Sequence, residues 1–282
     1  MGMIGLGIMG GAMARNLVAA GWRVLGYDPA ATVAGVEMQP DVATLARLAP
    51  TLMTSLASPQ ALHATAAALG GAPPRVVVEA STMALDDKVT FAAALPGHTV
   101  LDCPISGTGA QAIRRDLVVY ASGDTAAIQA LGPFFDAFTR AHYDLGAFGN
   151  GSRMKFVANL LVAVHNVASA EAMVLGMRAG LDPKQIIELI GAGVGTSRVF
   201  DLRAPMMAAG QYGPASMKVE VWQKDMSIIG AFAESLGVPT PLLDATVPIY
   251  DRAMAEGHSA DDTASVCAVL QGMARLDTPR PA

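Results

Sequence analysis

The chain has 282 residues, of which 52% are hydrophobic and 15% are charged, so one large or two ordinary domains with substantial cores are expected. Its formal net charge is -5 and it contains no basic run, which argues against nucleic acid as a partner. The two cysteines, Cys103 and Cys267, lie far apart without a CxxC pair, so neither a disulfide framework nor a zinc or other metal site is expected.

The most apolar stretch, residues 156–170, predicts a buried helix and not a membrane span. It is interrupted by Asn159, His165 and Asn166, and it is shorter than the roughly 20 apolar residues that a span needs. The chain begins with a glycine-rich turn and no cationic segment before it, which is not the pattern of a signal peptide. We therefore expect a cytoplasmic protein without a membrane partner.

The first half of the chain alternates short β-type runs with helical patterns. Strands are expected at residues 1–4, 23–27, 51–55, 75–80, 99–102, 117–121 and 141–145. Helices are expected between them, for example at residues 9–20, 59–69, 85–95 and 125–135. This alternation predicts an α/β domain over residues 1–150, built on one parallel, doubly wound sheet of the Rossmann type.

The pattern changes after residue 149, where strand signals end. Residues 152–180 read as one long helix, which Gly180 and the following Asp182-Pro183 terminate. Further helices are expected at residues 183–190, 220–236, 241–256 and 261–273, and residues 277–282 are expected to be disordered. Residues 151–282 are thus predicted to form an all-α domain that the long helix joins to the first domain.

The chain opens with a dinucleotide-binding pattern. Residues 5–10 read Gly-Leu-Gly-Ile-Met-Gly, which fits G-x-G-x-x-G between a strand and a helix. In that pattern the first glycine permits a tight turn, the second lets the backbone approach a pyrophosphate, and the third lets the helix pack on the strand. The helix then offers free N–H groups to the phosphates. Cofactor contacts are therefore expected from Gly5, Leu6, Gly7, Ile8, Met9 and Gly10.

Asp28 ends the second expected strand, about 20 residues after the start of the glycine-rich turn. A carboxylate at this place accepts hydrogen bonds from a ribose 2′-hydroxyl and repels a 2′-phosphate, so NAD is expected in preference to NADP. The alternative for Asp28 is a turn residue before Pro29. Ser81 and Thr82 follow the fourth strand, where they could meet the nicotinamide ribose, cap the next helix, or do both.

Lys155 and Asn159 stand four residues apart on the long helix, so their side chains reach the same spot. The lysine can exchange a proton with a substrate, and the asparagine can orient a hydroxyl or carbonyl group. The alternative, an ordinary solvated lysine, is disfavoured by the apolar run that follows. Ser106 and the amides near Gly107 lie in a loop of small residues, which could bind a carboxylate or could be only a flexible loop.

With these motifs the chain resembles the β-hydroxyacid dehydrogenase family, which includes 3-hydroxyisobutyrate dehydrogenases, tartronate semialdehyde reductases and the related 6-phosphogluconate dehydrogenases. The resemblance covers essentially the whole chain. It rests on the glycine pattern extended through residues 13–17, on Asp102-Cys-Pro-Ile-Ser106-Gly107, and on Gly149-x-Gly151-x-x-x-Lys155 followed by Asn159.

The resemblance implies an NAD-dependent oxidation of a small β-hydroxy acid, or the reverse reduction, with Lys155 as general acid/base and Asn159 assisting. Ser106 and Gly107 would contact the substrate carboxylate. Lys224, in a Lys-Asp pair that is similar to a C-terminal motif of the family, would reach into the cleft toward cofactor and substrate. The resemblance and the apolar long helix together imply a homodimer or homotetramer.

Two departures from the family pattern leave the identity of the substrate open. Thr108 stands where a second glycine is usual, and Gln111 stands where a glycine is frequent, so both are expected near the distal end of the substrate. Two other functions also stay open. One is an imine reductase of similar fold, which Lys155 disfavours because those enzymes often have aspartate or tyrosine there. The other is a non-catalytic NAD-binding protein.

Overall fold

The computed structural model describes residues 1–276 and divides the chain into two compact units between Lys155 and Phe156. The predicted boundary, between residues 150 and 151, lies in the first turn of helix α8 (Asn150–Arg178), which crosses the division. Residues 277–282, which were predicted to be disordered, lie outside the described part.

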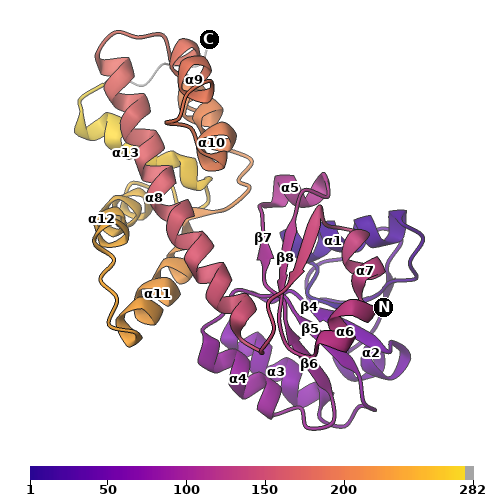
Figure 1. Cartoon of the computed structure of the whole chain (residues 1–282). Coiled ribbons are helices and arrows are strands. Elements are labelled where there is room, and N and C mark those ends of the chain that lie inside the picture. Colours follow the sequence, from indigo (N-terminus) through magenta and orange to yellow (C-terminus); the bar gives the residue numbers. More distant parts are fainter. Residues whose placement is uncertain (277–282) are drawn as a thin grey trace. The chain divides into compact units, whose positions relative to one another are not determined.

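The first unit contains a six-stranded parallel sheet with strand order β3-β2-β1-β4-β5-β6. Figure 1 labels β4, β5 and β6 of this sheet. The strands are β1 (Gly2–Ile4), β2 (Leu25–Tyr27), β3 (Glu37–Met38), β4 (Thr51–Thr54), β5 (Val76–Glu79) and β6 (Thr99–Asp102). The helices are α1 (Ile8–Ala19), α2 (Val42–Leu48), α3 (Pro59–Leu69), α4 (Leu85–Ala93), α6 (Thr125–Ala130) and α7 (Gly132–Asp136). The strand order reverses at β1, and the predicted doubly wound sheet is confirmed.

Hydrophobic layers cover both faces of this sheet, because successive strand residues point to opposite sides. In β4, Leu52 belongs to the layer formed with α2, α3 and α4, whereas Met53 belongs to the layer formed with α1 and α7. Val77 and Val78 of β5 divide in the same way. Burial on both faces explains why these strands read as continuous apolar runs.

The last two predicted strands of this unit belong to a separate sheet, so the prediction of one parallel sheet for all strands is wrong here. This three-stranded sheet consists of β7 (Ile105–Ser106), β8 (Val118–Ala121) and β9 (Ala141–Asp144), with β7 antiparallel to β8. Pro104 follows β6 and has no N–H to donate to a ladder, which favours a break in the first sheet at that point.

Several short elements were not predicted. Strand β3 and helix α2 occupy the segment after Asp28, and α5 (Gly109–Ile113) follows β7. The start of α2 had a readable signal, because Asp41 accepts a hydrogen bond from the Thr44 N–H at 2.6 Å as its N-cap. Elements of two to seven residues carry too few periodic positions to be recognised by pattern alone.

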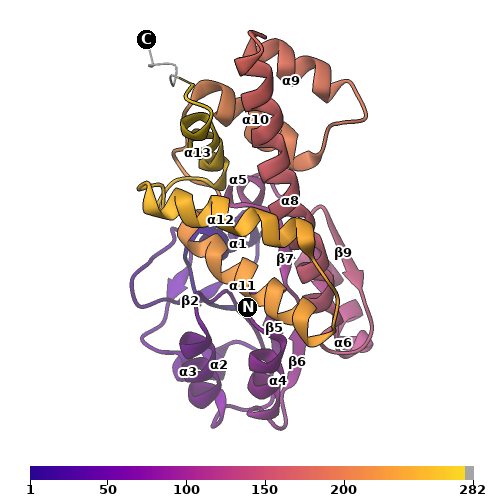
Figure 2. The same ribbon diagram turned by 90° about the vertical axis from the view of Figure 1, so that its left-hand side faces the viewer.

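The second unit is helical over residues 156–276, which confirms the predicted all-α organisation (Figure 2). Its elements are α8, α9 (Pro183–Gly191), α10 (Arg198–Ala209), α11 (Val219–Ser235), α12 (Pro241–Ala255), the 3-10 helix η1 (Thr263–Ser265) and α13 (Val266–Met273). Helix α10 was not predicted, and it contains Pro205 in its interior. Its start is capped by Ser197, whose Oγ accepts the Phe200 N–H at 3.0 Å.

Helix α8 supplies much of the core of the second unit. The Phe156 ring packs on Phe232 of α11 with a centroid distance of 5.1 Å. Further along α8, Asn166 Nδ2 donates to the Tyr250 hydroxyl of α12 at 2.9 Å. By length and composition alone this helix could also cross a membrane, and 44% of its most apolar window is buried in the fold. The contacts with α11 and α12 bury part of its apolar surface, whereas Val157, Leu161 and Leu175 stay at least half exposed.

Candidate active site

The three glycines of the turn between β1 and α1 have different surroundings. A Cβ on Gly5 would lie 2.2 Å from the Ser55 carbonyl oxygen, and one on Gly10 would lie 2.1 Å from the Gly5 carbonyl oxygen. Both positions therefore require glycine for close backbone packing. A Cβ on Gly7 would meet no atom of the described residues within 4 Å. The space above Gly7 is thus open to an approaching group, as a pyrophosphate requires.

Helix α1 begins with free amides at this same place. Its N-cap residue is Gly7, and no side chain of the described residues forms a capping hydrogen bond there. The first turn of the helix contains no acidic residue. The first hydrogen bond of the helix runs from the Gly11 N–H to the Gly7 carbonyl at 2.8 Å, so the amides of residues 8–10 have no partner inside the helix. An uncapped helix start of this kind fits the phosphates of a dinucleotide.

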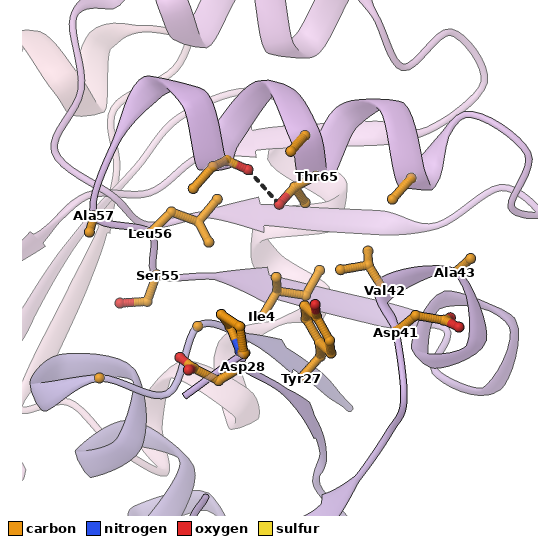
Figure 3. A pocket seen from close by; sticks show the side chains of 16 residues that line it. Ile4, Tyr27, Asp28, Asp41, Val42, Ala43, Ser55, Leu56, Ala57 and Thr65 are labelled. Carbon is orange, nitrogen blue, oxygen red and sulfur yellow. Dashed lines mark hydrogen bonds between the residues drawn. The ribbon is translucent and has the colours of Figure 1, made fainter. Parts of the chain in front are cut away.

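A pocket of about 530 Å³ opens beside the turn, where β1, β2 and β4 end (Figure 3). Tyr27 and Leu56 line it together with alanines of α3, so its surface is largely apolar. Asp28 and Asp41 are its only charged residues, and no lysine or arginine stands among the sixteen residues that line it. A pocket with this size and lining fits the adenosine half of a nicotinamide dinucleotide.

Asp28 is held in place by three backbone amides. Its Oδ2 accepts the Leu6 N–H at 2.7 Å, and its Oδ1 accepts the Ala30 and Ala31 N–H groups at 2.8 Å each. Partial burial acts to raise the pKa of this carboxyl, but the three hydrogen bonds outweigh burial and hold the pKa below its usual value. Asp28 therefore presents a negative charge to the pocket at neutral pH.

Ser81 supports the pocket from the end of β5. Its hydroxyl accepts the Leu56 N–H at 2.8 Å, and its own N–H donates to Glu79 Oε1 at 2.9 Å. Helix α4 begins after Ala84, its N-cap, without a side-chain cap. The alternative role of Ser81 or Thr82 as the N-cap of this helix is therefore wrong, since Ala84 occupies that position.

The predicted substrate loop begins at β7. Ser106 is half-buried at the end of that strand. Gly107 has a φ of 139°, and a Cβ there would lie 2.5 Å from Leu117 Cδ2, so this position requires glycine. Thr108 caps α5 in a reciprocal capping box, in which Gln111 Oε1 accepts the Thr108 N–H at 3.1 Å. Each of these two side chains therefore bonds the backbone of the other residue, and together they stabilise the start of α5.

Lys155 and Asn159 lie one turn apart on α8 and are both buried, with exposed fractions of 6% and 4%. The alternative of an ordinary solvated lysine is therefore wrong. One turn before the lysine, a Cβ on Gly151 would lie 2.3 Å from the Tyr120 carbonyl oxygen. The glycine of this motif thus lets the start of α8 pack directly on the backbone of β8.

Asn159 has a partner on α11 that was not predicted from the sequence. Its Nδ2 donates to Asp225 Oδ2 on α11 at 3.1 Å, and Asp225 is buried. Lys224 Nζ lies 3.4 Å from Asp225 Oδ1. Asp225 thereby fixes the orientation of the Asn159 amide. A carboxylate within the apolar pattern of residues 219–235 was the available signal, because a buried charge needs hydrogen-bond or ion-pair partners.

Neither a reactive cysteine nor a metal site accompanies these segments within the described residues. Burial raises the pKa of the Cys103 thiol far above its usual value, so this cysteine is a packing residue and not a nucleophile. Within residues 1–276, no group of three or more His, Cys, Asp and Glu side chains has the arrangement of a metal site.

Two family profiles match the chain, one in each half. The profile described as the NAD binding domain of 6-phosphogluconate dehydrogenase matches residues 1–147. The profile described as NAD-binding of NADP-dependent 3-hydroxyisobutyrate dehydrogenase matches residues 149–270. The glycine-rich turn and the segment with Lys155 therefore both fall inside matched regions.

Similar proteins share nearly the full length of the chain. L-threonate dehydrogenase of Cupriavidus necator is 31% identical over 97% of this chain and 96% of its own. Glyoxylate/succinic semialdehyde reductase 2 of Arabidopsis thaliana is 27% identical over 96% of this chain and 79% of its own. The crystal structure of 3-hydroxyisobutyrate dehydrogenase from Salmonella typhimurium superposes with a TM-score of 0.83 at 28% identity, over 95% of this chain and 98% of that one.

Proposed function

The chain belongs to the β-hydroxyacid dehydrogenase family, and we propose that it transfers a hydride between NAD and a small β-hydroxy acid of the 3-hydroxyisobutyrate type. It is an NAD(P)-dependent oxidoreductase that acts on the CH–OH group of small hydroxy acids. The observation that carries the proposal is the pair of buried polar side chains, Lys155 and Asn159, on one side of α8.

When bound at this site, NAD would supply the hydride chemistry of the reaction. Lys155 takes the proton of the substrate hydroxyl during oxidation and returns it during reduction. Asn159, whose amide Asp225 orients, holds the reacting oxygen in position. Ser106 and the Gly107 amide bind the substrate carboxylate, and Lys224 adds a positive charge for the substrate or the cofactor.

NAD is preferred to NADP in this proposal because of the charge in the pocket. The Asp28 carboxylate is ionised at neutral pH, and Asp41 adds a second negative charge to the lining. A 2′-phosphate needs a lysine or arginine, and the described lining contains neither. A ribose 2′-hydroxyl, by contrast, can donate to Asp28.

The proposal includes self-association into a homodimer or homotetramer. Large apolar side chains along α8, in the loop after it and along α9 are at least half exposed in the single chain, and a second copy of the chain would cover them. They are Val157, Leu161, Leu175, Leu181 and Leu189. Light scattering at micromolar concentration tests this part, and a monomer would contradict it.

The experiment that tests the reaction is oxidation of a substrate panel with NAD and, separately, with NADP. The panel contains 3-hydroxyisobutyrate, 3-hydroxypropionate, 4-hydroxybutyrate, glycerate, threonate and 6-phosphogluconate. We expect turnover with NAD on a small β-hydroxy acid. Turnover with NADP alone would overturn the argument from Asp28, and no turnover on any member by protein that binds NADH would overturn the substrate class.

A further inference from the structure

The first unit buries a charged cluster for which the proposed reaction has no direct use. Lys88 of α4 has its Nζ 2.7 Å from Glu79 Oε2 and 2.7 Å from Asp102 Oδ1. All three side chains are fully buried. Burial acts to lower the pKa of the Lys88 ammonium, but the two carboxylates outweigh it and raise the pKa above its usual value. Apolar side chains of similar volume would avoid the desolvation of such ions, so the cluster needs a reason beyond packing.

The excess charge of the cluster faces the start of α8. One ammonium and two carboxylates leave one negative charge in excess. Asp102 Oδ2 accepts the Ser152 N–H at 2.7 Å, and Asp102 Oδ1 accepts the Ser152 hydroxyl at 2.8 Å. Because the amino end of a helix carries a positive partial charge, a buried carboxylate here binds α8 through its dipole as well as through hydrogen bonds.

Two further contacts secure the same turn. Ser122 Oγ accepts the Gly151 N–H at 2.9 Å and donates to the Asp102 carbonyl oxygen at 3.1 Å. A Cβ on Gly151 would lie 2.7 Å from that carbonyl oxygen, so the helix start and the end of β6 are in direct backbone contact. Lys155 follows Ser152 by three residues, which is slightly less than one helical turn. The attachment of this turn therefore fixes the position of the Lys155 backbone.

The other end of the cluster reaches the nucleotide pocket. Glu79 Oε1 accepts the Ser81 N–H at 2.9 Å, and the Ser81 hydroxyl accepts the Leu56 N–H at 2.8 Å. Leu56 lines the pocket (Figure 3). A continuous series of short polar contacts thus joins the loop after β4 to the first turn of α8, and its charged members are buried inside the first unit.

We propose that this buried cluster is a positioning device for Lys155, which fixes the start of α8 against the loops that hold the cofactor. Lys88 and Asp102 are positioning residues in this mechanism, because they act on the reaction only through Lys155. The inference rests on the proposed role of Lys155 as the acid/base. A rigid attachment matters for that role, since a misplacement of about 1 Å can lower a rate by about two orders of magnitude.

The first test is Asp102→Asn, which keeps the size of the side chain and removes its charge. We expect kcat to fall by roughly 10- to 100-fold, with the dissociation constant of NADH unchanged within about twofold. Phe138→Leu is the control for general destabilisation, since Phe138 is fully buried in the same unit and packs on the rings of Phe134 and Phe135. It should lower the unfolding temperature while kcat stays within about twofold of the parent.

The second test asks whether the effect passes through Lys155. Added to Lys155→Ala, the Asp102→Asn change should lower the residual rate by less than about twofold, because the group that it positions is gone. An equal loss in both backgrounds would show a general structural role and overturn the inference. If Lys155→Ala alone retains full activity, the proposed function fails instead, so the two failures are distinguishable.

Ser152→Ala provides a milder route if Asp102→Asn does not fold. It removes the hydroxyl contact with Asp102 and keeps the backbone N–H contact. We expect kcat to fall by roughly 3- to 10-fold, again only when Lys155 is present. A parental kcat in this variant would overturn the inference.

Discussion

The Asp28 carboxylate accepts a hydrogen bond from the Leu6 backbone N–H, with 2.7 Å between Leu6 N and Asp28 Oδ2. Leu6 belongs to the glycine-rich turn and Asp28 directly follows β2, so this contact joins the two segments that a dinucleotide would touch. The same carboxylate lines the pocket. One side chain therefore both shapes the turn and sets the charge that a cofactor ribose would meet.

Asp28→Asn should shift cofactor use from NAD toward NADP. The amide removes the negative charge that repels a 2′-phosphate and weakens acceptance from the 2′-hydroxyl. We expect the KM for NAD to rise by roughly 10-fold or more, which corresponds to one lost charged hydrogen bond. Initial rates with each cofactor measure the ratio, and an unchanged NAD to NADP ratio would contradict the ribose role of Asp28.

Gly7→Ala and Gly10→Ala should separate cofactor binding from folding. A methyl group on Gly7 meets only open space, so stability should be retained, while the dissociation constant of NADH rises by roughly 10-fold or more. A methyl group on Gly10 meets the Gly5 carbonyl oxygen and should lower the free energy of unfolding by about 3 kcal/mol. Urea unfolding and NADH fluorescence titration measure the two effects. Tight NADH binding by Gly7→Ala would argue against a pyrophosphate above this residue.

Lys155→Ala should remove proton transfer and leave cofactor binding nearly intact. General acid–base catalysis typically contributes a factor of about 100 to 10,000, so kcat should fall by that order. Lys155→Arg keeps a positive charge that does not titrate in the working range, so it should be almost as inactive. Single-turnover rates with NADH titrations give both quantities. Loss of NADH binding in the alanine variant would show that Lys155 supports the cofactor site instead of the chemistry.

The parts of the fold that are encoded locally could be predicted from the sequence. The glycine pattern from Gly5 to Gly10 can be read from six consecutive residues, and the long helix around Lys155 is an unbroken helix of 29 residues in the structure. The alternation of strands and helices likewise predicted the doubly wound sheet. Such features need only neighbouring residues to be recognised.

Contacts between distant residues could not be predicted in this way. Asn159 meets Asp225 across 66 residues, and Ser152 meets Asp102 across 50, and nothing in one sequence pairs these positions. The separation of the second sheet and the helix that contains Pro205 were missed for a different reason, because tertiary packing there outweighs local propensity.

Asp225 should act on the reaction through Asn159. Asp225→Ala removes the acceptor of the Asn159 amide, and loss of a buried hydrogen bond to a charged group should lower kcat/KM by roughly 10- to 100-fold. Asp225→Asn is the matched control, since it keeps the size and one carbonyl acceptor, and it should recover much of the loss. Steady-state kinetics of both variants, alone and with Asn159→Ala, test the coupling. Additive losses would contradict an action through Asn159.

Asp262 should make the stability of the helical unit depend on acid. This buried carboxylate lies 3.2 Å from Arg203 Nε and accepts the Ser216 N–H and hydroxyl at 2.8 and 2.7 Å. Burial acts to raise its pKa, but Arg203 and the hydrogen bonds outweigh burial and hold the pKa below the usual 3.8. Its ionised form therefore contributes stability above that value, and the contribution is lost as the pH falls through the lower pKa of the folded state.

The variant Asp262→Asn tests this dependence. At neutral pH it should lower the free energy of unfolding by about 3–5 kcal/mol, because Arg203 is left buried without its carboxylate. The difference between parent and variant should stay constant down to the usual pKa of an aspartate and shrink below it, since the parent then protonates as it unfolds. Urea unfolding from pH of about 7 to about 3.5 measures the difference. If the difference in the free energy of unfolding between parent and variant is the same at the lowest pH as at neutral pH, Asp262 is not the group whose titration changes the stability.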